Sequence, residues 1–298
     1  MKRKPLQRGV RLHKTVSQHP LVFPPGATKA WYDVSKKGRV VYGNEEWGFR
    51  KGYRGRVIET DSGIYCAGYN IDERFKRLPI MEAVKWNEDL PTAFDYKFLI
   101  KLLYYAHGKK VVRFKSQYQL LKTLSIPLND RNYNRVVTSL LKWNFIVFHF
   151  AGRFTWKAKQ KKNEDSFKYF KVIRSFDIPV DSNDQVQIRF SSDFMELLGG
   201  KYATFLNLPT VEALRSETAL NLHQYLSSFN RLLDGGRELT RNIKEFSRMM
   251  FSSESRPYRL RGQIGKAITE INKASRGVSF QVSFDEEKGL VSFSKRNE

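Results

Sequence analysis

The order of predicted helices and strands over residues 216–296 constrains the fold of this chain most strongly. Apolar residues recur at helical spacing in three stretches, the last of which is a long helix at 256–273. A short strand at 237–239 separates the first two helices, and a β-hairpin follows the third at 278–293. A helix, a strand, two further helices and a hairpin in this order are typical of a winged helix.

A looser copy of the same order lies between residues 90 and 178. Thr92 and Ser116 are placed to cap its first two helices, and Pro127 ends the second because proline cannot continue a helix. The third helix is expected from about residue 132 to 143. Two strands follow it and are joined by a long, lysine-rich tip.

Residues 1–80 differ in composition from the rest of the chain. Glycine and aromatic residues alternate with short β-prone runs, and 17 Lys and Arg face 7 Asp and Glu. This segment is either a small β-rich module or an extended arm. Its Gly, Tyr and Arg residues would stack on bases or follow phosphates; alternatively, the segment packs on the rest of the chain. We therefore predict an α+β fold in which this basic, Gly- and aromatic-rich extension precedes two tandem winged-helix domains at 81–185 and 186–298.

The charge of the chain indicates its class of partner. Lys and Arg number 53 against 30 Asp and Glu, a formal net charge of +23, and the basic clusters coincide with the predicted helix-turn-helix elements. Such an excess favours a polyanion, here nucleic acid. Cys66 is the only cysteine, which excludes an internal disulfide and a thiolate zinc site, and no cofactor or metal is expected. No apolar run approaches the ~20 residues that span a bilayer, and no secretory signal is present, so we expect a cytoplasmic protein without a membrane partner.

The third helix of the later domain has the two faces that a recognition helix needs. At 100° per residue, Leu260, Ile264 and Ile271 share one face with the other apolar residues. The residues predicted to meet DNA are Arg256, Tyr258, Arg259, Arg261, Gly262, Lys266, Thr269 and Lys273. Among these, Arg261 lies at the flank and suits a phosphate. Gly262 and Gly265 each cost roughly 1 kcal/mol of helix propensity, which indicates close approach by a duplex or tight packing against another helix.

The third helix of the earlier domain is predicted to behave in the same way. Its core stripe is expected to be Tyr133, Val137, Leu140 and Leu141. The residues predicted to face outward to DNA are Arg131, Asn132, Arg135, Ser139 and Lys142, of which Asn132 and Arg135 suit adenine and guanine. Phosphate contact or simple solvation are the alternatives. The lysine-rich tip (Lys157, Lys159, Lys161 and Lys162) would reach phosphates or a minor groove, or form a solvated loop.

Three short stretches carry a resemblance to a known family: Glu217–Leu226 at the first helix of the later domain, Ile268–Ser275 at its third helix, and 278–282 in its hairpin. They resemble the second winged helix of iteron-type plasmid replication initiators. The similarity covers about 90–296 in the order of elements and 217–284 in motif. The basic extension departs from the family's pattern.

The resemblance implies an initiator that binds repeated double-stranded sites at a plasmid or phage origin. Such proteins help to open adjacent AT-rich duplex and recruit the host initiator and the replicative helicase. They commonly bind DNA as monomers and form homodimers that repress their own promoter, with the first winged helix at the dimer interface.

The residues offer little support for an enzyme. The five histidines are scattered without metal-ligand spacing, no phosphate-binding Gly-x-x-x-x-Gly-Lys-Ser/Thr loop is present, and the carboxylates show no pairing for metal-assisted cleavage. We expect no catalytic residues. The alternatives to an initiator are a tandem winged-helix transcriptional repressor without an origin role and a basic RNA- or ribosome-associated protein.

Overall fold

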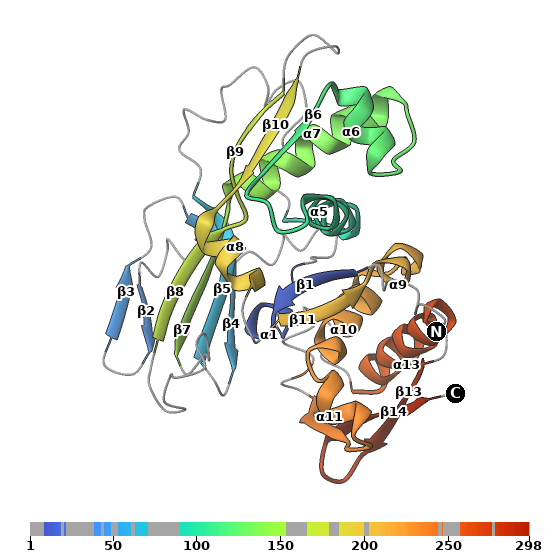
Figure 1. Cartoon of the computed structure of the whole chain (residues 1–298). Helices are drawn as coiled ribbons and strands as arrows, with labels where there is room; N and C mark the ends of the chain where they lie inside the picture. Colours follow the sequence, from blue (N-terminus) through green and yellow to red (C-terminus); the bar gives the residue numbers. More distant parts are fainter. Residues whose placement is uncertain are drawn as a thin grey trace. The chain divides into compact units, whose positions relative to one another are not determined.

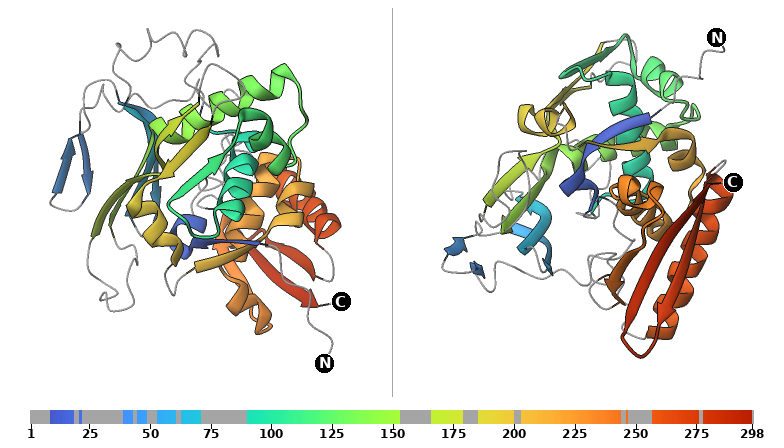
Figure 2. Two further views of the ribbon diagram at one scale, coloured as in Figure 1. Left: turned by 45° about the horizontal axis from the view of Figure 1, so that its top comes forward. Right: turned by 60° about the horizontal axis from the view of Figure 1, so that its bottom comes forward.

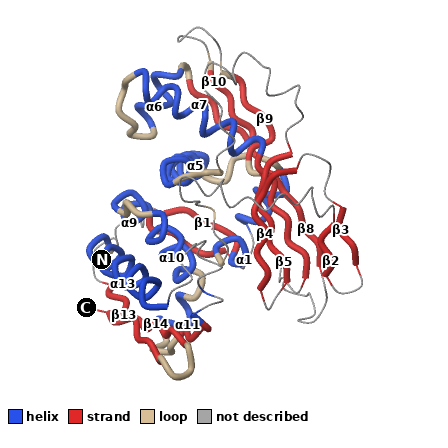
Figure 3. The backbone as a smooth tube through the Cα atoms, turned by 180° about the vertical axis from the view of Figure 1, so that it is seen from behind, coloured by secondary structure: helices blue, strands red, loops and turns tan. Residues whose placement is uncertain are grey.

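The computed structural model consists of two compact units, each built from helices and strands (Figures 1 and 3), which confirms the predicted α+β class. The central unit is 24–201; the terminal unit joins 1–23 to 202–298. The structure describes residues 9–18, 21, 39–42, 45–48, 53–60, 63–70, 90–152, 166–178, 185–199, 203–243, 246, 257–275 and 278–297. Across those residues, no helix combines the length and the apolar character needed to cross a membrane.

The helices of the central unit begin at well-formed caps. They are α5 (Ala93–Ala106), α6 (Gln117–Thr123), α7 (Asp130–Phe145) and α8 (Ser192–Gly199). The Ser116 hydroxyl accepts a hydrogen bond from the backbone N–H of Gln119 at 3.2 Å, and the Asn129 side chain accepts one from the N–H of Asn132 at 2.9 Å. These bonds satisfy N–H groups that have no partner within the first turn of a helix. The predicted cap at Ser116 is therefore confirmed.

The described strands of the central unit form three sheets. A three-stranded antiparallel sheet has the order β6 (Val111–Phe114), β10 (Val186–Phe190) and β9 (Ile173–Asp177). A four-stranded sheet has the order β4 (Tyr53–Thr60), β5 (Gly63–Asn70), β7 (Ile146–Gly152) and β8 (Ser166–Lys171). The strands β2 (Arg39–Tyr42) and β3 (Glu45–Gly48) pair as a hairpin.

One face of the four-stranded sheet carries an aromatic core. Tyr65, Phe148, Phe150 and Phe170 alternate along the strands with ring centroids 4.9 to 6.2 Å apart, and Phe194 of α8 stacks on Phe170 at 5.9 Å. All five side chains are almost completely buried. Alternate strand residues share a face, so this core fixes the register of the sheet.

The terminal unit is assembled from both ends of the chain. Its elements are β1 (Gly9–His13), α1 (Lys14–Ser17), β11 (Ala203–Asn207), α9 (Leu208–Ala213), α10 (Glu217–Ser227), α11 (Asn230–Asp234), β12 (Leu239–Asn242), α13 (Pro257–Ala274), β13 (Val278–Asp285) and β14 (Leu290–Asn297). The strands β1 and β11 pair antiparallel over their full length. The second sheet has the order β12-β14-β13, and α13 lies along its hairpin (Figure 2).

Both units repeat one sequence of elements. In the central unit α5, β6, α6 and α7 lead to the sheet β6-β10-β9; in the terminal unit α10, β12, the helical residues Ile243 and Phe246, and α13 lead to the sheet β12-β14-β13. In each sheet the strand between the helices pairs with the last strand of the hairpin. The central unit differs because β7 and β8 intervene between its third helix and its hairpin.

Backbone pairing divides the chain differently from the predicted boundaries. The strand β5 pairs with β7, so residues 53–70 share a sheet with the predicted first domain instead of forming a separate extension. The strand β1 pairs with β11, which attaches residues 9–13 to the terminal unit. The strand β10 pairs with β6 and β9, which places residues 186–190 in the central unit.

Candidate nucleic-acid interface

The apolar face of α13 is buried as its sequence period predicts. Leu260, Ile264, Ala267, Ile268 and Ile271 are each at most 5% exposed. The helix packs there against α10, α9 and β13. Apolar residues at intervals of three and four form one stripe on a helix, so burying this stripe turns the other face of α13 outward.

The outward face of α13 is polar and basic. The six residues predicted to face DNA on this side are all exposed: Tyr258, Arg259, Gly262, Lys266, Thr269 and Lys273. Gln263, which was not among the predicted residues, is exposed as well. Tyr258 is 63% exposed, and the Nε of Arg259 donates to its hydroxyl at 3.2 Å. The Thr269 hydroxyl donates to the Gly265 carbonyl at 3.0 Å, which leaves its oxygen as an acceptor facing solvent. Arg256 lies outside the described residues.

The two glycines of α13 have open space around them. A Cβ built on Gly262 or Gly265 meets no other atom within 4 Å. The sequence left two explanations for these glycines. Within the described residues no other helix packs tightly against them, so the packing explanation is not supported. The backbone at Gly262 is exposed on the same face as Arg259 and Lys266, so it is accessible to an external ligand.

Two residues of the family-like run Ile268–Ser275 hold α13 in place. The Glu270 carboxylate accepts hydrogen bonds from the backbone N–H groups of Arg215 and Ser216, and from the Ser216 hydroxyl at 2.7 Å. Asn272 exchanges two hydrogen bonds of 2.8 Å with the backbone of Phe280 in β13. Both side chains link α13 to distant segments, α10 through its N-cap and the hairpin through β13. Hydrogen bonds to an ionised acceptor contribute about 1.5–3 kcal/mol each.

Arg261 turns toward the hairpin instead of toward solvent. It forms an ion pair with Glu286, and its guanidinium lies 5.7 Å from the centroid of the Phe284 ring. The predicted phosphate contact at this position is therefore not supported by the structure. The reason is the proximity of an acidic turn, which neutralises the charge that a phosphate would use.

The turn between β13 and β14 is itself mainly acidic. Asp285 accepts a hydrogen bond from the Lys288 backbone at 3.1 Å, which holds the pKa of this carboxyl below its usual range. The Lys288 ammonium lies 3.4 Å from the same carboxylate, and Gly289 closes the turn with a φ of 62°. Three carboxylates and one lysine occupy positions 285–288, so this turn repels phosphates.

On α7, Arg131 and Arg135 are exposed, as predicted. The Arg135 guanidinium lies 3.9 Å from the centroid of the Phe94 ring in α5, a cation–π contact that orients it. Partial burial lowers the pKa of Arg135, and the positive charge of Arg131 acts in the same direction. These two arginines are the predicted residues of α7 that the structure leaves available to a ligand.

The outward orientation predicted for Asn132, Ser139 and Lys142 is wrong, since all three are buried. The Asn132 amide donates to the Pro127 carbonyl at 2.9 Å, which fixes the preceding turn. The helix is rotated from its predicted phase: Val136 and Trp143 join Leu140 and Leu141 in the core, whereas Tyr133 and Val137 are only half-buried. The buried stripe thus includes polar positions that the apolar pattern had assigned to the surface.

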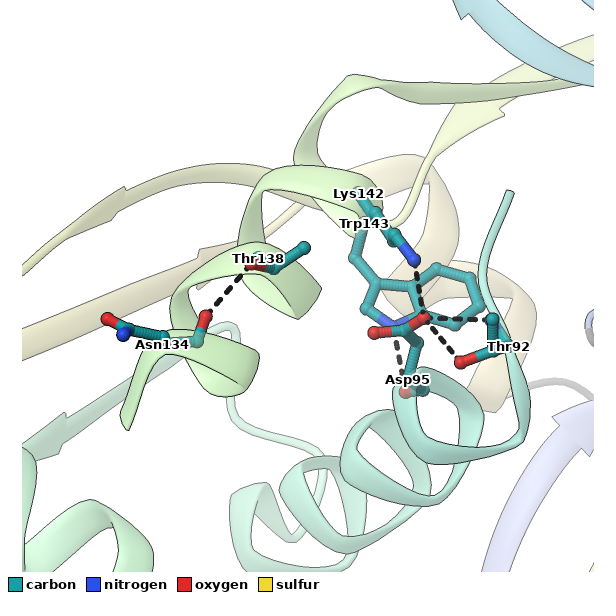
Figure 4. A network of polar contacts seen from close by, with 6 residues as sticks. All are labelled: Thr92, Asp95, Asn134, Thr138, Lys142 and Trp143. Atoms are coloured by element: carbon teal, nitrogen blue, oxygen red, sulfur yellow. Dashed lines mark hydrogen bonds and ion pairs between the residues drawn. The ribbon is translucent and has the colours of Figure 1, made fainter. Parts of the chain in front are cut away.

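Lys142 is neutralised inside the protein by Asp95 (Figure 4). Its ammonium lies 3.0 Å from the Asp95 carboxylate, which also accepts from the backbone N–H and the hydroxyl of Thr92 at 2.8 and 2.9 Å. The Trp143 indole donates to the Asp95 carbonyl at 2.8 Å. Asp95 therefore caps α5 and binds α7 at once. The Thr92-x-x-Asp95 spacing of a capping box is the sequence signal that would have located it.

The predicted lysine-rich tip, Lys157, Lys159, Lys161 and Lys162, lies outside the described residues. The strands on either side of it pair as expected, with Gly152 opposite Ser166. By sheet order, however, the hairpin that corresponds to β13–β14 is β9–β10, because β10 pairs with β6 as β14 pairs with β12.

No family model and no curated protein sequence matches the chain. A crystal structure of a selenomethionine derivative of domains 2 and 3 of RctB matches with a TM-score of 0.53 and 14% identity, over 96% of this chain and 99% of that one. The chain shares the fold of these two RctB domains. At 14% identity, this likeness shows the fold alone.

Two further structures match more loosely. A second crystal structure of RctB domains 2–3 has a TM-score of 0.47 and 12% identity, over 96% of each chain. The Pi initiator protein in complex with iteron DNA has a TM-score of 0.40 and 15% identity, over 69% of this chain and 90% of that one.

Proposed function

We propose that this chain is a replication initiator without catalytic activity, which binds repeated double-stranded DNA sites at a plasmid or phage origin through two winged helices. The observation that carries the proposal is the outward face of α13. Glu270 and Asn272 hold this helix at the edges of its apolar face, and the opposite face presents Arg259, Lys266 and an open backbone at Gly262.

The chemistry of this face suits a duplex. Arginine reads guanine and contacts phosphates, and lysine neutralises phosphates, while a glycine lets the helix backbone approach the groove closely. The order of elements around α13 and the β12-β14-β13 sheet supports a winged helix, in which the third helix enters the major groove. Arg131 and Arg135 on α7 are the corresponding candidates in the central unit.

The remaining parts of the proposal rest on the resemblance to iteron-type initiators. They are opening of the neighbouring AT-rich duplex, recruitment of the host initiator and helicase, and a homodimer that represses its own promoter. The chain is expected to act in the cytoplasm and to need no cofactor. The basic segment at the start of the chain is the part without a counterpart in that family.

Footprinting on the DNA that flanks its own coding region tests the proposal. We expect protection of regularly spaced repeats at salt concentrations where a random duplex of equal length is not protected. Uniform protection without repeats, or preferential binding of structured RNA at equal concentration, would contradict it. A plasmid-maintenance assay then separates an initiator from a repressor, since a repressor supplied in trans does not sustain an origin fragment.

A further inference from the structure

A second group of cations lies in the terminal unit, on elements other than α13. Lys14 of α1 and Arg241 of β12 both approach the ring of Phe229, which follows α10. The Lys14 ammonium lies 5.2 Å and the Arg241 guanidinium 5.1 Å from the ring centroid. The shared ring brings the two positive charges into one region, and Arg231 of α11 adds a third to their field.

The Arg241 side chain is held in a fixed direction. Its Nε donates to the Tyr225 hydroxyl at 2.8 Å, and one of its terminal nitrogens donates to the Thr240 carbonyl at the same distance. The guanidinium has five N–H donors, so these two bonds leave donors for a ligand. A positioned guanidinium loses little entropy when it binds an oxyanion.

Three cations elsewhere on the terminal unit are neutralised by carboxylates. Arg261 pairs with Glu286, Lys288 with Asp285 and Lys295 with Asp234. By contrast, neither Lys14, Arg231 nor Arg241 has a carboxylate partner within the described part of the chain. Burial lowers the pKa of Lys14, and the positive charges of Arg231 and Arg241 lower it further. Like charges assembled without a counter-charge are unfavourable in the free protein, and an anion would relieve the repulsion.

We propose that Lys14, Arg231 and Arg241 form a second site, which takes a phosphate group. Under the proposed function, on which this choice of source rests, the group belongs to the backbone of bound DNA. The site gives residues 9–17 a role: β1 pairs with β11 and so brings Lys14 near α11 and β12, which lie more than 200 positions later in the sequence. The Gln224 amide, which donates to the Val16 carbonyl at 3.4 Å, joins α1 to α10 in the same way.

The first test compares Lys14→Gln and Arg231→Gln with Lys288→Gln, which removes a lysine that is paired with Asp285. Binding to a duplex that the wild-type chain protects is measured between about 50 and 200 mM salt. Each lost phosphate contact lowers the slope of log affinity against log salt by about 0.9. We expect that decrease for Lys14→Gln and Arg231→Gln, and no change for Lys288→Gln. Arg241 is left intact because it also bonds Tyr225.

The second test uses inorganic phosphate alone, without DNA. In wild-type protein with ¹³C-methylated lysines, phosphate is expected to shift the Lys14 resonance, identified from its loss in Lys14→Arg, and to raise the pKa of that amine. Arg231→Gln should weaken the shift, whereas Lys288→Gln should not. A further outcome is that phosphate shifts the Lys14 resonance while the Lys14 and Arg231 variants leave the salt slope of DNA binding unchanged. That result would keep the phosphate site but assign it to free phosphate or a nucleotide instead of DNA.

The outcomes separate the two proposals. If Lys266→Ala weakens duplex binding while Lys14→Gln changes neither the salt slope nor the phosphate response, the second site is rejected and the proposed function stands. If wild-type protein protects no DNA but phosphate still acts on Lys14 through Arg231, the proposed function is rejected and the site stands.

Discussion

The third helices of the two units, α7 and α13, show opposite uses of polar residues. On α13 the residues predicted to face outward are exposed, and Arg261, predicted at the flank, pairs with the hairpin. On α7 three of five predicted outward residues are buried, and one of them is a lysine that requires Asp95 to neutralise it. The two helices occupy the same position in the order of elements but differ in use. The polar face of α13 is exposed, whereas most of the predicted outward residues of α7 are buried in contacts that hold the helix in place.

The difference has a physical cause in the neighbouring helices. The aspartate of α5 offers an internal counter-charge, so α7 can bury Lys142 and turn its polar side inward. On α13 the charged and amide anchors, Glu270 and Asn272, bond backbone groups at the rim of the helix, and the opposite face is exposed. The comparison predicts that changes in α7 act mainly on stability, whereas changes in the outward face of α13 act mainly on binding.

The largest expected effect is on stability, in the central unit. Asp95→Asn leaves the buried Lys142 ammonium without its counter-charge, and breaking a buried ion pair in this way costs about 3–5 kcal/mol. Denaturant unfolding measures the loss. Lys288→Gln breaks an exposed pair and is expected to cost at most about 1 kcal/mol. Equal effects of the two changes would show that Lys142 reaches water in solution. Adding Lys142→Met to Asp95→Asn should restore part of the loss.

The next effect is a dependence of stability on pH. Burial lowers the pKa of His149 in the central unit and of His223 in the terminal unit to about 4. The unfolded chain binds protons at these histidines near pH 6.5, so their contribution is complete above pH 6.5 and is lost as the pH falls toward 4. Full protonation of one such histidine is expected to cost roughly 3 kcal/mol. His223→Gln should flatten the dependence of the unfolding free energy on pH between 6.5 and 4. An unchanged slope would mean that His223 is protonated in the folded protein over this range.

Binding is expected to respond most to the outward face of α13. Arg259→Ala and Lys266→Ala should each weaken binding to the protected repeat by ~1–3 kcal/mol if they read bases. Fluorescence anisotropy with the repeat and a random duplex distinguishes the roles, since equal losses on both indicate phosphate contacts. Arg135→Ala on α7 is the matched comparison, because Arg135 is also exposed and its guanidinium contacts the Phe94 ring. No loss from either α13 variant would reject this face as the interface.

The sequence predicts α13 well because its period and its polarity agree. Every apolar residue of the stripe, from Leu260 to Ile271, is buried, and the two strands of the hairpin follow as expected. The same reasoning fails for α7 because Asn132, Ser139 and Lys142 are polar residues that are nevertheless buried. Burying them depends on partners such as Pro127 and Asp95, which the period of one helix does not contain.

The unit boundaries could not be predicted for a similar reason. The pairing of β1 with β11 joins residues almost two hundred positions apart, and the pairing of β10 with β6 crosses the expected border at residue 185. Local pattern gives the existence of these strands, but their partners depend on long-range register. The cation group at Lys14, Arg231 and Arg241 is a product of that pairing, so no local motif marks it.

The smallest change tests the purpose of the glycine at the centre of the α13 face. Because a Cβ on Gly262 meets nothing within 4 Å, Gly262→Ala should stabilise the helix by roughly 1 kcal/mol through its better propensity. If the backbone approaches a duplex there, the same methyl group weakens binding, so stability and affinity move in opposite directions. Thermal unfolding and anisotropy on one sample measure both. Gly265→Ala, also unobstructed but only half-exposed, is the control and should stabilise with a smaller loss of affinity. A stabilised Gly262→Ala that binds like the wild type would mean that DNA, if bound, stays clear of the backbone at this turn.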